Sequence, residues 1–161
     1  MLSQPAVADT LTISNIGVTV HGLQPDKSTA AIMKNKIDST GRFAAHPELN
    51  MVYRKDALIL NAVVLRDCFD NTTYYISGGK RLWLSKSSES DVSFLMGLYV
   101  RPSVKDLKVP DKLQSGNRDW LPLPFLTYTK RIPINQKGNF EFNVGTNFFL
   151  THATVGYSFN F

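Results

Sequence analysis

Hydrophobic and polar residues alternate along several stretches of the chain, most regularly at its C-terminal end. In Thr151–Phe161 every second residue from Phe161 back to Ala153 is apolar, and the residues between them are polar or small. Because successive side chains of a strand point to opposite faces, this stretch predicts a strand with one apolar and one polar face. A tilted strand of this length spans the hydrocarbon layer of a bilayer.

The same pattern predicts seven further strands and two long connections. The strands are Leu11–His21, Pro47–Lys55, Ala57–Arg66, Thr72–Ser85, Asp91–Arg101, Trp120–Ile134 and Phe140–Phe148. The long connections are residues 22–46, with a helical turn expected around Ala30–Lys36, and residues 102–119. Eight strands joined by alternately long and short connections indicate an all-β fold, an antiparallel up-and-down β-barrel of the outer-membrane type.

Which face of the strands lies inside the barrel decides between two kinds of barrel. The second face of the last strands carries small and polar residues, which suit a wet interior better than a dry core. We therefore expect Phe142, Phe159 and Phe161 to point outward. A water-soluble barrel with the apolar face inside is the alternative.

Composition and charge narrow the classes of protein further. The length favours one domain, a barrel over 11–161 that follows a short tail, 1–10. No run approaches the ~18 apolar residues of a membrane helix, and the first ten residues lack the pattern of a signal peptide. The net charge of +5 indicates a basic rim; nucleic-acid binding rests on that charge alone, and no nucleic-acid partner is expected.

Candidate chemistry gathers where two of the predicted strands end. Strands Leu11–His21 and Ala57–Arg66 run in the same direction, so His21 and the pair Asp67 and Cys68 should share one rim. A histidine base, a carboxylate and a nucleophilic side chain are the groups used in acyl transfer. A histidine at a strand end also occurs with no catalytic role. The residue spacings predict no metal site and no cofactor.

Four segments give the chain a resemblance to a known family. They are the V-T-V-H run ending at His21, the segment Asn61–Phe69, the segment Arg118–Pro124 with its P-L-P motif, and two final strands that end on Phe161. In their order and spacing these segments resemble the lipid A palmitoyltransferase (PagP) family. The resemblance implies a monomeric outer-membrane enzyme that transfers a palmitoyl chain from a phospholipid to lipid A.

The resemblance also implies roles for individual residues. His21, Asp67 and Cys68 match the family's catalytic histidine, aspartate and serine, so a thiol replaces a hydroxyl. Substrate-binding positions implied in the same way are Gly79 at the floor of an acyl pocket, Arg118 and Asp119, and Pro122 and Pro124 beside a lateral lipid entry. The alternative hypothesis is a non-catalytic barrel of the same ancestry that serves as a structural or binding module. A viral origin is one form of this alternative. Cys68 and the missing signal pattern motivate it.

Overall fold

A computed structural model describes residues 9–22, 27–104, 109–147 and 149–161. The strands are β1 (Thr10–His21), β2 (Phe43–Lys55), β3 (Leu58–Arg66), β4 (Thr72–Leu84), β5 (Ser90–Pro102), β6 (Gln114–Ser115), β7 (Arg118–Asn135), β8 (Gly138–Thr146) and β9 (Leu150–Asn160). The helices are α1 (Lys27–Ile32) and a 3₁₀ turn, η1 (Asp111–Leu113). No helix in these ranges has the length and apolar character needed to cross a membrane.

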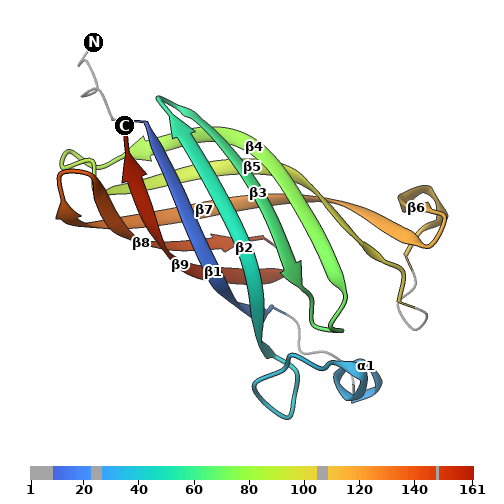
Figure 1. The fold of residues 1–161 in the computed structure, drawn as a ribbon. Helices are drawn as coiled ribbons and strands as arrows, with labels where there is room; N and C mark the ends of the chain where they lie inside the picture. The colour runs from blue at the N-terminus through green and yellow to red at the C-terminus, as the bar shows by residue number, and fades with distance from the viewer. Residues whose placement is uncertain (1–8, 23–26, 105–108, 148) are drawn as a thin grey trace.

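Eight of the strands in the described residues close into an antiparallel barrel (Figure 1). Each barrel strand pairs with the next barrel strand along the chain, so that β5 pairs directly with β7, and β1 pairs with β9 to close the barrel. The two-residue strand β6 lies outside the barrel and pairs with β7. The predicted all-β, eight-stranded antiparallel barrel is therefore confirmed.

The two ends of the barrel differ in their connections. The "turn end" carries the start of β1, the end of β9 and the tight turns β2–β3, β4–β5 and β7–β8. The "loop end" carries α1, η1, β6 and the connections that follow β1, β3, β5 and β8 (Figure 1). Up-and-down topology produces this separation because every second connection returns to the same end.

Several predicted boundaries are wrong, for identifiable reasons. Strand β2 begins at Phe43, not Pro47, since residues 43–47 pair with β1 while pairing with β3 begins only at Glu48. Pro47 is tolerated in β2 because the strand has no hydrogen-bonded neighbour on its β3 side at this residue, so the missing N–H group breaks no hydrogen bond there. The helix covers Lys27–Ile32 instead of Ala30–Lys36.

Other differences fall in the second half of the chain. Pairing of β4 with β5 runs unbroken through Gly78 and Gly79, and the irregularity lies between Arg81 and Trp83. The connection 102–119 contains η1 and β6, and β7 already begins at Arg118. Strand β8 is Gly138–Thr146, and Phe148 lies outside the described residues.

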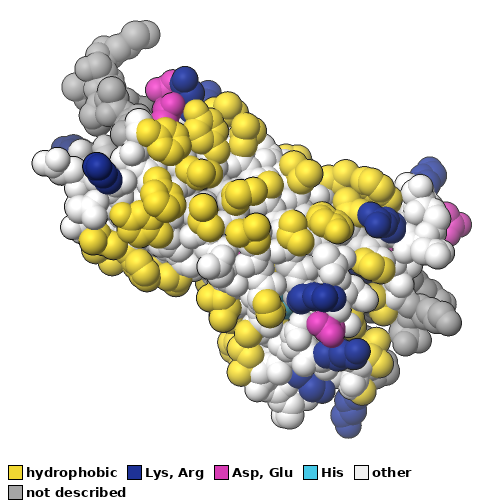
Figure 2. All heavy atoms as spheres, viewed as in Figure 1, with side chains coloured by type: hydrophobic (Ala, Val, Ile, Leu, Met, Phe, Trp, Pro, Cys, Tyr) yellow, Lys and Arg dark blue, Asp and Glu magenta, His cyan; other side chains and the backbone are white. Residues whose placement is uncertain are grey.

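The outer face of the barrel wall is apolar, as the alternation predicts, and many of the buried residues inside are polar. Phe142 and Phe159 are 42% and 43% exposed on the outer face, and Phe161 is 68% exposed. Figure 2 shows hydrophobic side chains spread over the wall, with Lys and Arg gathered toward the two ends. The buried residues include threonines, serines and charged side chains of the barrel interior. The alternative with the phenylalanines inside is wrong.

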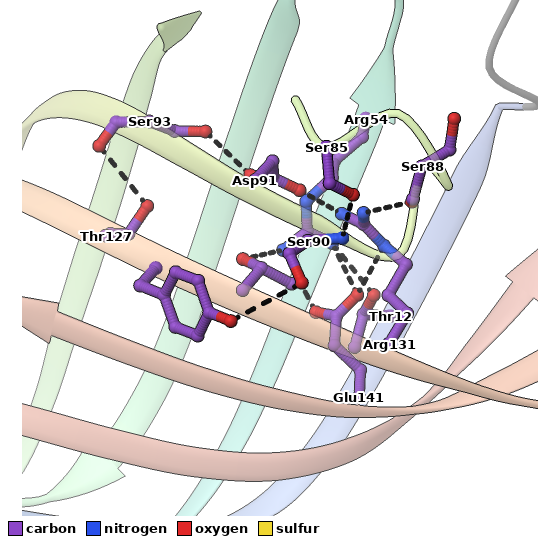
Figure 3. A network of polar contacts seen from close by, with 12 residues as sticks. Thr12, Arg54, Ser85, Ser88, Ser90, Asp91, Ser93, Thr127, Arg131 and Glu141 are labelled. Atoms are coloured by element: carbon purple, nitrogen blue, oxygen red, sulfur yellow. Dashed lines mark hydrogen bonds and ion pairs between the residues drawn. The ribbon is translucent and has the colours of Figure 1, made fainter. Parts of the chain in front are cut away.

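A buried charge network fills the interior at the turn end (Figure 3). The Arg54 Nη2 atom lies 2.9 Å from Glu141 Oε1, and Arg131 Nε lies 3.3 Å from Glu141 Oε2. Arg131 also pairs with Asp91, and Arg54 donates a hydrogen bond of 2.9 Å to Thr12. Charges at this depth are tolerated because they neutralise one another, and together they close this end of the barrel.

Above the network the interior becomes apolar. Val52, Ile59 and Leu95 are at most 5% exposed and pack together, with Phe125 against them. These side chains come from β2, β3, β5 and β7, so they form a layer across the barrel. This apolar layer lies between most of the charge network and the space that opens toward the loop end, and Arg54 of the network still reaches that space.

Candidate active site

A cavity of about 700 Å³ occupies the barrel interior. The apolar layer lines its deep part, and His21, His46 and Cys68 line it where it reaches the loop end. The volume falls within the range of ligand pockets in proteins. Asn50, 7% exposed, also lines the cavity, and its Oδ1 atom has no partner among the described residues. The surface of the cavity is mostly apolar, and polar side chains such as Asn50 and Arg54 also reach its wall.

Cys68 is held in the connection between β3 and β4. Its side chain packs with Met33, Ala44 and Phe69, and its carbonyl accepts hydrogen bonds from the backbone N–H groups of Lys34 and Asn35. Burial raises the pKa of the Cys68 thiol to about 12, and the negative charge of Asp67 acts in the same direction. At neutral pH the sulfur is a protonated thiol, so it needs a base to become a nucleophile.

Two histidines approach this sulfur. His21 Nε2 lies 3.3 Å from Cys68 Sγ and His46 Nε2 lies 3.9 Å from it. His21 is the last residue of β1 and half-buried, whereas His46 is 3% exposed near the start of β2. The predicted meeting of His21 and Cys68 at one rim agrees with this geometry.

Asp67 lies beside Cys68 but contacts neither imidazole. Its Oδ1 atom accepts hydrogen bonds from the backbone N–H groups of Phe69 (2.9 Å) and Asn71 (2.8 Å). Its Oδ2 atom has no partner among the described residues. The carboxylate therefore shapes the turn that presents Cys68, and it does not orient His21 as the resemblance implies.

The predicted substrate-binding residues of β7 lie at the loop end. Asp119, 1% exposed, accepts hydrogen bonds from Arg101 (3.1 Å) and Ser103 (2.7 Å), while Arg118 is exposed. Pro122 lines the cavity. Pairing with β8 begins only at Leu126, so the edge of β7 that carries both Pro122 and Pro124 is unpaired on that side.

Gly79 lies beside the floor of the cavity without lining it. It pairs with Leu95, a residue of the apolar layer, across β4 and β5. A Cβ atom added at Gly79 would collide with the Phe94 carbonyl oxygen and lie 2.7 Å from Leu95 Cα. Glycine is therefore required here by the close approach of two strands, and a larger residue would displace Leu95.

Another polar pair, Glu48 and His152, is not among the predicted site residues, and His152 of this pair lines the cavity. His152 Nε2 lies 2.9 Å from Glu48 Oε2, and His152 Nδ1 lies 2.9 Å from Thr19 Oγ1. The ring of His152 lies 6.2 Å from that of His46, centroid to centroid. The structure places Glu48 and His152 on the inner side of the wall, and one sequence gives no register that would have predicted their contact.

Gly17 makes room for this pair. Glu48 and His152 come from the strands on either side of β1, and they meet over Gly17, where a Cβ atom would collide with both side chains. The β1 register shifts just before Gly17 in both ladders, which marks a bulge. A bulge next to glycine re-aims neighbouring side chains.

We therefore predict that Gly17→Ala separates Glu48 from His152. The buried carboxylate then loses its partner, and the barrel should lose about 1–3 kcal/mol of unfolding free energy, measured by urea titration in micelles. Gly78→Ala is the matched control, because a Cβ there meets only Leu60 Cδ2 at 3.4 Å and Ile59 O at 3.9 Å. Equal effects of the two variants would show that the pair contributes nothing.

Comparisons with known protein families and with curated proteins find no match for this chain. Within the described residues no group of three or more His, Cys, Asp or Glu side chains is arranged to hold a metal ion. The class that the structure itself defines is a closed β-barrel with a thiol and two imidazoles at the mouth of an internal cavity.

Proposed function

We propose that this protein is an outer-membrane acyltransferase that moves an acyl chain from a phospholipid to lipid A. The observation that carries the proposal is the place of Cys68, between two imidazoles at the mouth of a largely apolar cavity. An acyl chain would lie in the cavity with its carbonyl carbon near the sulfur. The outward apolar wall suits a protein surrounded by lipid.

Features of the wall support the same function. The unpaired edge of β7 beside Pro122 and Pro124 gives an acyl chain a lateral route from the membrane into the cavity. Arg118, exposed at the loop end, is a cation suited to lipid phosphate groups. The resemblance to the lipid A palmitoyltransferase family adds the identity of donor and acceptor, and it supports a monomer that needs no cofactor.

The test is transfer of a radiolabelled palmitoyl chain from a phospholipid to lipid A by the refolded protein in detergent, followed by thin-layer chromatography. We expect labelled lipid A with wild type and a loss of at least about 10-fold with His21→Ala, which removes the imidazole that contacts the sulfur. Lys137→Ala, an exposed change in the β7–β8 turn, should leave the rate unchanged. Absence of transfer by wild type, or full transfer by His21→Ala, would remove the proposal.

One observation favours the alternative, a non-catalytic structural or binding barrel. Asp67 is bonded within its own turn and does not orient His21. Fractionation of the native protein separates the two functions by location. An acyltransferase acting on lipid A belongs in the outer membrane, whereas recovery in a soluble fraction without detergent would favour the alternative.

A further inference from the structure

We propose that His46 is the base that deprotonates Cys68, and that the enzyme works through a thioester on Cys68. The inference rests on the proposed acyltransferase function and adds a catalytic residue and an intermediate to it. It starts from a contrast between the two histidines that face the sulfur.

The orientation and protonation of His46 are fixed by its surroundings. Its Nδ1 atom lies 2.7 Å from the carbonyl oxygen of Arg66. A carbonyl only accepts, so Nδ1 carries the proton and donates. In the neutral ring Nε2 then holds a free electron pair, and this atom faces Cys68 Sγ at 3.9 Å. A nucleophile, a base and a group that orients the base thus stand in sequence.

No comparable anchor holds His21 among the residues that the structure describes. In the described residues its side chain makes one hydrogen-bond contact, from Nε2 to Cys68 Sγ at 3.3 Å, and no group fixes Nδ1. Asp67, the residue expected to orient it, is occupied by the backbone of its own turn. The thiol has one proton to donate, so the two contacts are complementary if the thiol donates to His46 and His21 Nε2–H donates to the sulfur.

The chemical steps balance with these groups alone. The thiol proton moves to His46 Nε2 as the sulfur attacks the ester carbonyl carbon of the donor, forming a carbon–sulfur bond. The ester carbon–oxygen bond breaks, and the leaving oxygen takes the proton from His46 to give the lysophospholipid. In the second half, an acceptor hydroxyl gives its proton to His46 and attacks the thioester. The carbon–sulfur bond breaks, and the thiolate recovers the proton.

His21 has a supporting place in this scheme. A thiolate at this buried position would be costly without nearby donors, and the His21 N–H stabilises the negative sulfur while His46 carries the positive charge. Loss of His21 therefore removes one hydrogen bond to a charged atom, whereas loss of His46 removes the proton acceptor.

The experiment uses the full chain refolded in micelles, with p-nitrophenyl palmitate as the acyl donor and no acceptor lipid. Samples quenched in acid are examined by intact-protein mass spectrometry and peptide mapping. We expect one palmitoyl group on the peptide that contains Cys68, released by neutral hydroxylamine as a thioester is. An adduct elsewhere, or p-nitrophenol release without any adduct on Cys68, would overturn the thioester.

His46→Asn tests the base, because the asparagine amide can retain the bond to the Arg66 carbonyl while the Nε2 atom is lost. We expect acylation of Cys68 to slow by about 10²–10³-fold, and by only about 10-fold in His21→Asn. His46→Gln replaces His46→Asn if the latter does not refold. A wild-type acylation rate in the folded His46 variant, or a larger loss from His21→Asn, would overturn the assignment.

Alkylation of Cys68 by iodoacetamide gives a readout that needs no acyl donor. At pH 7.5 we expect the folded His46 variant to react at least about 10-fold more slowly than wild type, and an unchanged rate would count against the base. Alkylation and acylation that depend on His46, together with no transfer to lipid A, would refute the proposed function and leave this inference standing. Transfer to lipid A without a thioester on Cys68 would refute this inference and leave the proposed function standing.

Discussion

Glu141→Ala is expected to lower the unfolding free energy of the barrel by about 3–5 kcal/mol. Glu141 is 1% exposed and is the carboxylate that both Arg54 and Arg131 contact. Its removal leaves two guanidinium groups in the interior with Asp91 as the remaining carboxylate partner. The cost arises from buried positive charge left unpaired, and a urea titration in micelles measures it.

Glu89→Ala is the matched control for this prediction. Glu89 also pairs with a cation, Lys130 at 2.8 Å, but both side chains are 40% exposed. Water screens such a pair, so its loss should cost at most about 1 kcal/mol. If the two variants destabilise the barrel equally, the buried network contributes no more to the unfolding free energy than an exposed ion pair does, and the prediction is wrong.

The period-two pattern was sufficient to predict the barrel and its faces. Side chains in a strand alternate whatever their neighbours are, so strands such as Asp91–Arg101 show their inner and outer sets directly. The ends of β2 were harder to predict, because Pro47 signals a boundary locally while the pairing of residues 43–47 with β1 is a contact distant in sequence.

The candidate site was only partly predictable for a related reason. Topology alone brings the ends of β1 and β3 to one rim, and so it places His21 near Cys68. The orientation of His46 depends on its contact with the Arg66 carbonyl on the neighbouring strand, and the position of His152 depends on the space over Gly17. Registers and bulges of this kind do not appear in the residue types of one chain.

The position of Asp67 shows the limit of carrying roles over from a resemblance. The residue type and place match a catalytic aspartate, but the side chain accepts two backbone hydrogen bonds of its own turn. An aspartate that begins a tight turn can accept hydrogen bonds from the backbone of that turn in any protein, whether or not it is catalytic. The sequence therefore located the rim that holds His21 and Cys68, whereas the structure shows that the anchored imidazole is His46.

Ile76→Arg tests whether the apolar wall faces lipid. Ile76 lies mid-strand in β4 and is 69% exposed on the outer face. In a bilayer an arginine at mid-depth costs about 2–4 kcal/mol, and the cost falls to about 0–1 kcal/mol near the interface. We therefore expect Ile76→Arg to destabilise the barrel in lipid vesicles by about 2–4 kcal/mol, measured by reversible urea unfolding.

Leu82→Arg gives the matched comparison on the same strand, because Leu82 is 61% exposed but lies close to the turn end. A lipid-facing wall makes the cost depend on depth, so Ile76→Arg should destabilise the barrel more than Leu82→Arg does. A wall that faces water has no such gradient, since an exposed arginine costs little at either position. Equal, small effects at both positions would therefore contradict the proposed membrane location and leave the proposed acyltransferase without a lipid donor.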